Sequence, residues 1–261
     1  MKARSISAVN KLDMERKIEI YTRFIPQVIL DRFDIPPSFI DANGNQLLRL
    51  RCEPGTTDVV IDLKHAFNAE DPLLYAHLTD TVNGQIHVLL YVVNDPTSKR
   101  YNIDRMPDGT KTQFGIFKRN LVVEETAMNA GLAPGQVRSG MRILGQSISC
   151  FEKFVSSLDH DLFFAEPLHY HNAVIFEKYG FAYLRGRRLM ERIHQGFQED
   201  EEYFLKLDGT SPFRSPELAD SIRGRSWAIH DGVLGEAFDR VTMYKSINRH
   251  AGLNTFPNAK W

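Results

Sequence analysis

The chain has 261 residues, 43% of them hydrophobic and 25% charged, and a formal net charge of -1 at pH 7. This composition excludes a disordered chain, a collagen and a simple coiled coil. The near-zero net charge excludes a strong overall electrostatic field that would attract nucleic acid. The longest apolar run, residues 88–93, is far shorter than the ~20 residues of a membrane span. We therefore expect neither nucleic acid nor a membrane as a partner. The two separate cysteines, and an N-terminus without an apolar signal segment, predict a cytoplasmic protein.

The N-terminal part of the chain predicts one helix followed by an antiparallel sheet. Apolar residues recur at helical spacing over residues 12–33. Short runs rich in Val, Leu, Ile and Tyr then predict strands over residues 46–52, 57–63, 72–79 and 85–93. Asn83 and Gly84 predict a hairpin turn, so we expect the last of these strands to be antiparallel to its hairpin partner.

The middle of the chain predicts alternating helices and strands. Residues 120–130 are ambiguous between helix and strand, and a glycine-rich loop follows over 131–140. Helices are then expected over 141–158, 171–179 and 187–207, and strands over 161–166 and 181–184. We expect strand 161–166 to lie beside the segment before Gly131, and helix 141–158 to pack on one face of the sheet.

The whole pattern predicts an α+β fold, in which helices flank a mixed and mostly antiparallel sheet. A turn-rich stretch begins at Asp208. It predicts a domain over residues 1–207 and a C-terminal extension over 208–261, whose apolar content indicates that it docks on the main domain.

Residues 172–181 read Asn-Ala-Val-Ile-Phe-Glu-Lys-Tyr-Gly-Phe. This segment resembles the Asn-x-x-Ala-x-x-x-Tyr-Glu-Lys-x-Gly-Phe signature of the GCN5-related N-acetyltransferase superfamily. Together with the order of elements, the resemblance covers residues 85–184. It implies an acyl-coenzyme A N-acyltransferase-like fold in which strand 161–166 splays from its neighbour and admits the cofactor. It also implies acetyl-coenzyme A or another acyl-coenzyme A as cofactor and a small-molecule amine as substrate. A homodimer is compatible with the resemblance.

The resemblance also implies where the cofactor binds. Its pyrophosphate is expected at the loop before helix 141–158, where a helix N-terminus offers free backbone amides. The residues implied are Gln136, Val137, Arg138, Ser139 and Gly140 for the pyrophosphate, with Asn172 and Phe176 beside the pantetheine arm. The family's loop reads Gln/Arg-x-x-Gly-x-Gly/Ala, and alignment on Gly140 leaves both flanking positions unmatched. An ordinary connection with Ser139 as helix N-cap is the alternative.

Acyl transfer to an amine needs a general base and an acid for the leaving thiolate. Glu124 and Glu125 are the expected candidates for the base, and surface carboxylates on a helix turn are the alternative. Phe176 stands where the family often has the acidic tyrosine, and phenylalanine has no proton to give. Tyr179 and Tyr170 are therefore the candidates for the acid.

Two other functions remain open on the sequence. His169 and His171 would share a face of an extended chain, and with Glu166, itself another candidate base, they would make a two-histidine, one-carboxylate metal site. A metal-dependent enzyme is therefore one alternative. A non-catalytic protein that binds a ligand or partner in the cofactor cleft is the other. The Arg185-Gly-Arg-Arg188 run predicts either a binding site for a phosphate or an acidic partner, or the basic start of a helix.

Overall fold

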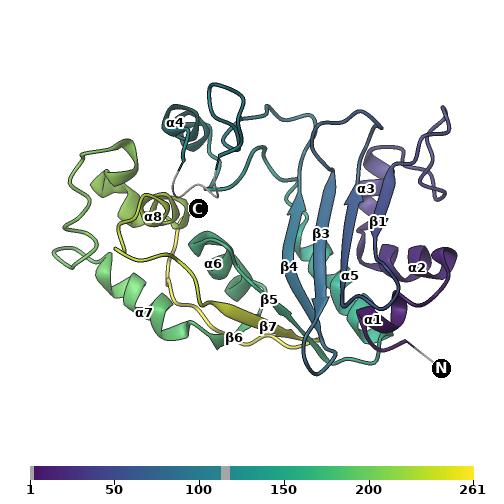
Figure 1. Cartoon of the computed structure of the whole chain (residues 1–261). Helices are drawn as coiled ribbons and strands as arrows, with labels where there is room; N and C mark the ends of the chain where they lie inside the picture. Colours follow the sequence, from purple (N-terminus) through teal and green to yellow (C-terminus); the bar gives the residue numbers. More distant parts are fainter. Residues whose placement is uncertain (1–2, 113–117) are drawn as a thin grey trace. The chain divides into compact units, whose positions relative to one another are not determined.

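The computed structural model describes residues 3–112 and 118–261, and its mixed helices and strands confirm the α+β class. Packing divides the chain into two compact units, each assembled from three segments. The first unit comprises Met1–Thr97, Gly140–Glu166 and Tyr244–His250, and the second comprises Ser98–Ser139, Pro167–Met243 and Ala251–Trp261. Figure 1 follows the chain through both. Within the described ranges, no helix is long and apolar enough to cross a membrane.

The first unit is built on a sheet whose first four strands follow one another in the chain (Figure 1). They are β1 (Leu48–Arg51), β2 (Asp58–Leu63), β3 (Leu74–Asp80) and β4 (Ile86–Val93), each antiparallel to the next. Gly84 turns the chain between β3 and β4 with a φ of 74°, a conformation that glycine adopts without strain. The predicted hairpin and the antiparallel pairing of residues 85–93 are therefore confirmed.

The next strand, β5 (Leu162–Ala165), pairs parallel to β4 through His87↔Phe164 and Val88↔Ala165. The expectation that it lies beside the segment before Gly131 is wrong. That segment is helix α4 (Leu121–Asn129), whose backbone groups are used within the helix and cannot form a ladder. On the other side of β5 the unit contains the end of β7 (Thr242–Ser246), after which the amide of Ile247 donates to the carbonyl of Asp161 at 2.8 Å.

Helices of the first unit cover this sheet. The single helix expected over residues 12–33 is wrong, because Pro26 has no amide hydrogen and holds Ile25 in an extended conformation. The segment forms α2 (Met14–Tyr21), the 3-10 turn η1 (Thr22–Phe24) and α3 (Gln27–Arg32), after a short α1 (Ile6–Val9). The helix expected over 141–158 is confirmed as α5 (Leu144–Ser157). Its Phe151 ring packs 5.1 Å from Tyr91 of β4 and 5.8 Å from Phe163 of β5, which places α5 on one face of the sheet.

The second unit contains mostly helices. They are α4, α6 (Tyr170–Lys178), α7 (Arg187–Gly196) and α8 (Ile222–His230), with the 3-10 turns η2 (Pro212–Arg214) and η3 (Pro216–Asp220). Strand β6 (Ala182–Arg185) lies beside the start of β7. Trp227 is fully buried in this unit, where its indole nitrogen donates to the carbonyl of Leu132 at 2.9 Å and its ring stacks on Phe213.

Two sequence predictions in this unit have opposite outcomes. The helix expected over 171–179 is confirmed as α6, and Gly180, with a φ of 82°, ends it. The helix expected over 187–207 is wrong beyond Gly196. A Cβ atom at Gly196 would lie 2.3 Å from Cδ2 of Tyr203, and the Tyr203 amide donates back to the Gly196 carbonyl. The chain therefore reverses at Gly196, where Tyr203 packs against it. This tertiary contact cannot be recognised from the helical periodicity of the sequence.

Candidate functional site

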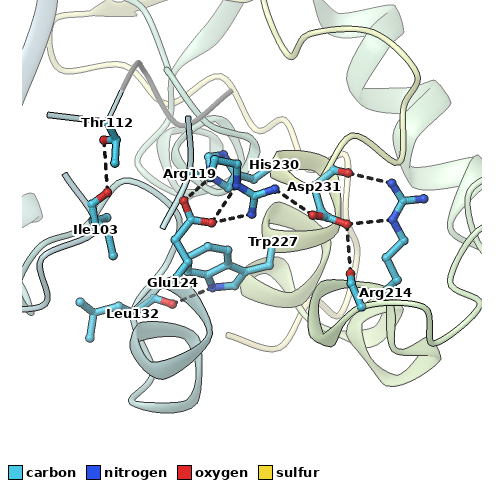
Figure 2. A network of polar contacts seen from close by, with 10 residues as sticks. Ile103, Thr112, Arg119, Glu124, Leu132, Arg214, Trp227, His230 and Asp231 are labelled. Carbon is cyan, nitrogen blue, oxygen red and sulfur yellow. Dashed lines mark hydrogen bonds and ion pairs between the residues drawn. The ribbon is translucent and has the colours of Figure 1, made fainter. Parts of the chain in front are cut away.

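A network of buried charges in the second unit connects α4 with the end of α8 (Figure 2). Arg119 Nε donates to Oε2 of Glu124 at 2.9 Å, and its Nη1 donates to Oδ1 of Asp231 at 2.8 Å. Arg214 Nε donates to the other oxygen of Asp231 at 2.9 Å. Nε2 of His230 lies 3.4 Å from Oε1 of Glu124. Each of the two carboxylates thus has a cationic partner, which a buried charge requires.

This pairing keeps both carboxylates ionised. Burial by itself raises the pKa of Glu124, which is only 3% exposed, but hydrogen bonds from His230 and Arg119 outweigh it and the pKa is lowered. Burial likewise raises the pKa of Asp231, and hydrogen bonds from Arg119 and Arg214 lower it overall. At neutral pH, Glu124 is therefore an anion that accepts hydrogen bonds and holds the His230 ring in position.

His169 and His230 line two pockets of the second unit. The smaller pocket, of about 350 Å³, is also lined by Glu124 and Gly135. The larger, of about 450 Å³, is lined by the same two histidines and by Tyr170 and Ser226. The two imidazole rings lie 5.8 Å apart, edge to face. Two imidazole groups, which can donate or accept protons, thus line pockets that are large enough to hold a small molecule.

The His169 side chain is neutral at physiological pH. Burial and then the neighbouring charge of His230 lower its pKa to about 4. Its Nε2 faces the backbone of Gly135, where a Cβ atom would lie only 2.6 Å away. Behind it, the His171 ring is stacked at 5.5 Å, and its Nδ1 lies 2.8 Å from Oγ of Ser226. Burial also lowers the pKa of His171 well below its ordinary value. Both rings are therefore neutral hydrogen-bonding groups.

The four residues expected to be catalytic have different surroundings. Glu124 lies in the network and lines the smaller pocket, whereas Glu125, one position further round α4, is partly exposed. Tyr170 is buried and lines the larger pocket, and burial raises its pKa to about 12. Tyr179 follows the last residue of α6 and is 39% exposed. Glu124 and Tyr170 are thus the two of the four that line the pockets.

None of the residues expected to bind the cofactor lies at the start of α5, because this helix begins only at Leu144. Three of them make internal hydrogen bonds. Gln136 Oε1 accepts from the amide of Ala133, the carbonyl of Val137 accepts from Tyr101, and Arg138 donates to the carbonyl of Ser98. The others are Ser139 and Gly140, which are exposed, and Asn172 and Phe176, which lie in α6 with the Phe176 ring stacked on Phe181 at 4.8 Å.

The three residues of the predicted metal site, Glu166, His169 and His171, have different neighbours. In the first unit, Oε1 of Glu166 lies 3.5 Å from Nε2 of His87. In the second, His171 lies in the first turn of α6, close after the N-cap His169, and not on an extended chain. Among the residues that the structure describes, no three His, Cys, Asp or Glu side chains are grouped so that they could hold a metal ion.

The first unit contains an open edge of β4. The ladder with β5 involves only His87 and Val88 of β4, and the β3–β4 register shifts between His77 and Leu78, which leaves Leu89 as a bulge. The apolar segment 89–93 that follows is only partly buried. In the described part of the chain, no strand pairs with this segment on the β5 side. Tyr91 Oη donates to Ser147 Oγ at 3.0 Å, so the first turn of α5 lies close to this part of β4.

Sequence reasoning missed Arg119, His230 and Asp231, which complete the charged network. His230 is 106 residues from Glu124, and Asp231 is 112 residues from Arg119, so no local pattern could have joined them. Comparison of the chain with protein-family models, curated proteins and solved structures gives no match.

Proposed function

We propose that the protein is an acyl-coenzyme A-dependent N-acyltransferase that acts on a small amine. The observation that carries the proposal is the open edge of β4. There an apolar strand in the middle of a sheet loses its parallel neighbour after Val88 and remains partly exposed. A strand edge with free amides and carbonyls, lined by apolar side chains, suits an extended ligand that carries amide groups, such as a pantetheine arm.

The start of α5 supports the same proposal. A helix of 14 residues offers unpaired amides and a partial positive charge at its first turn. When the family's Gln/Arg-x-x-Gly-x-Gly/Ala pattern is aligned on the helix start, it falls on Arg142, Gly145 and Ser147. The first two positions match, and serine is a small residue at the third. We therefore assign the cofactor's pyrophosphate to residues 142–147, in place of the 136–140 loop.

The second unit, taken by itself, contains groups that can exchange protons. Acyl-coenzyme A supplies the acyl group as a thioester, and transfer to an amine forms a C–N bond while the C–S bond breaks. Within this unit, His230 is oriented by Glu124 and is our candidate for a base, and Tyr170, which is protonated at neutral pH, is our candidate for an acid. General acid–base help of this kind is worth about 10² to 10⁴ in rate.

A binding experiment tests the cofactor site. Calorimetric titration with coenzyme A is expected to give saturable binding, weakened at least tenfold by Arg142→Glu. Lys153→Glu makes the same charge change on an exposed position of α5, further along the helix, and should leave the affinity nearly unchanged. The absence of coenzyme A binding to the unaltered protein would refute the proposal.

A turnover experiment tests the activity. Release of free thiol from acetyl-coenzyme A should require an amine from a broad panel, and Tyr170→Phe should slow it by tenfold or more. Tyr179→Phe is the matched control, because this tyrosine is 39% exposed and lies at the end of α6. Coenzyme A binding without turnover for any amine would favour a non-catalytic binding protein on the same fold.

A further inference from the structure

A pocket of about 400 Å³ lies at the turn between β6 and α7, wholly within the second unit. Its charged lining consists of Arg185, Arg188, Arg192, Arg240, Glu236 and Asp239. Four guanidinium groups against two carboxylates leave a formal excess of two positive charges. This excess of positive charge in a concave site favours the binding of an anion there.

Close packing builds this pocket from two separate segments. Gly186, with a φ of 99°, joins β6 to α7, and a Cβ atom there would lie 2.9 Å from Cα of Val241 and 3.1 Å from the carbonyl of Arg240. Only glycine permits this approach. It brings the arginines of the β6–α7 turn together with Arg240 of the segment that precedes β7.

Not all of the positive charge is neutralised within the pocket. Arg192 forms an ion pair with Glu236, and Arg185 Nη2 lies 3.4 Å from Oγ1 of Thr242. The guanidinium of Arg188 makes no hydrogen bond or ion pair with any residue that the structure describes. Arg188 also lies in the first turn of α7, where the helix dipole already favours an anion and disfavours a cation. The N–H donors of the Arg188 guanidinium are therefore available to an anion in a pocket that has excess positive charge.

We propose that this pocket binds a small molecule that carries a phosphate monoester. A phosphate dianion matches the excess of two positive charges, and its oxygens accept the paired N–H donors of guanidinium groups. The pocket volume accommodates a small organic body beside the phosphate, against the side chains of Leu189 and Ala237. The inference does not depend on the proposed acyltransferase activity, because the two sites share no residue.

Calorimetric titration with inorganic phosphate and with glycerol 3-phosphate tests the site, and glycerol serves as the neutral counterpart. Both anions should bind at low salt, glycerol should not, and raising the salt should weaken binding. Affinity should fall between pH 7.5 and pH 5, because the second ionisation of a phosphate monoester has a pKa of about 6 while arginine stays charged. The absence of binding by both anions, or glycerol binding as well as its phosphate, would overturn the proposal.

The chain supplies a matched pair of variants. Arg188→Glu is expected to weaken glycerol 3-phosphate binding at least tenfold. Arg187→Glu makes the same charge change on the adjacent residue, which is paired with Glu191 and does not line the pocket, and should weaken binding less than threefold. Equal effects of the two variants would mean that only net charge matters, and the pocket would not be the site. Arg142→Glu in the first unit should have no effect, which separates this test from that of coenzyme A binding.

Discussion

Nε2 of His169 faces the backbone of Gly135 so closely that a methyl group at this glycine would lie 2.6 Å from it. The glycine therefore makes room for a neutral imidazole that lines both pockets of the second unit. The position of His169 depends on a residue 34 places earlier in the chain. This relationship can be tested without knowledge of the substrate.

We expect Gly135→Ala to displace the His169 ring and to destabilise the protein by about 2–4 kcal/mol, from backbone strain at positive φ together with overpacking. Gly109→Ala is the control, because Gly109 has the same φ of 81° but a methyl group there would have no neighbour within 4 Å. It should lose only the ~1–2 kcal/mol of backbone strain. Urea unfolding of both variants measures the difference, and equal losses would contradict the close packing of Gly135 on His169.

Replacement of Glu124 by glutamine should lower the free energy of unfolding by about 2 kcal/mol at pH 7, because hydrogen bonds to a charged group are lost. The folded-state pKa of Glu124 is lowered, so its stabilisation is present above the unfolded value of about 4.3 and is lost as pH falls through the folded pKa. Urea unfolding at pH 7, 5, 4 and 3 should show a constant difference between the unaltered protein and E124Q down to about pH 5, then a shrinking one. Glu125→Gln, on a partly exposed neighbour, should leave the free energy of unfolding at pH 7 nearly unchanged.

The neutral state of His169 predicts a second pH dependence, at higher pH. Its folded pKa of about 4 lies below the unfolded value of about 6.5. The stabilisation is therefore fully present above about pH 6.5 and declines towards pH 4, by at most about 1.4 kcal/mol per pH unit. His169→Asn should remove this part of the slope. Imidazole chemical shifts measured by NMR would contradict the assignment if His169 titrated near 6.5.

Arg119→Lys should destabilise the second unit although the charge is kept. The guanidinium donates to Glu124 and to Asp231 through different nitrogens, and a lysine ammonium is a point charge that cannot reproduce this geometry. We expect a loss of about 2–3 kcal/mol in urea unfolding. Arg187→Lys is the matched control, because its single exposed pair with Glu191 is worth less than about 0.5 kcal/mol. Similar losses of stability in both variants would show that the paired contacts of Arg119 contribute no more than a single exposed ion pair.

Most helices and strands of this protein could be located from local patterns of residues. The runs rich in Val, Leu, Ile and Tyr before and after Asn83-Gly84 predicted β3, β4 and their antiparallel pairing, and helical periodicity predicted α5 and α6. These features depend on residues a few positions apart, and the same backbone geometry recurs wherever such a pattern occurs. Prediction failed first where a single residue overrode the pattern, as Pro26 does in the segment of α2 and α3.

The pairing of segments that are distant in the chain depends on tertiary packing, which no local pattern reveals. It paired β5 with β4, made a helix of the segment before Gly131, and stopped α7 where Tyr203 packs on Gly196. It also brought Glu124 to His230, more than 100 residues away. The physical reason is that burial and charge pairing act between any surfaces that meet in the folded chain, whereas periodicity reports only which face of an element is apolar. The sequence therefore named Glu124, His169 and Tyr170 as candidates, and the fold selected the partners that determine their charge.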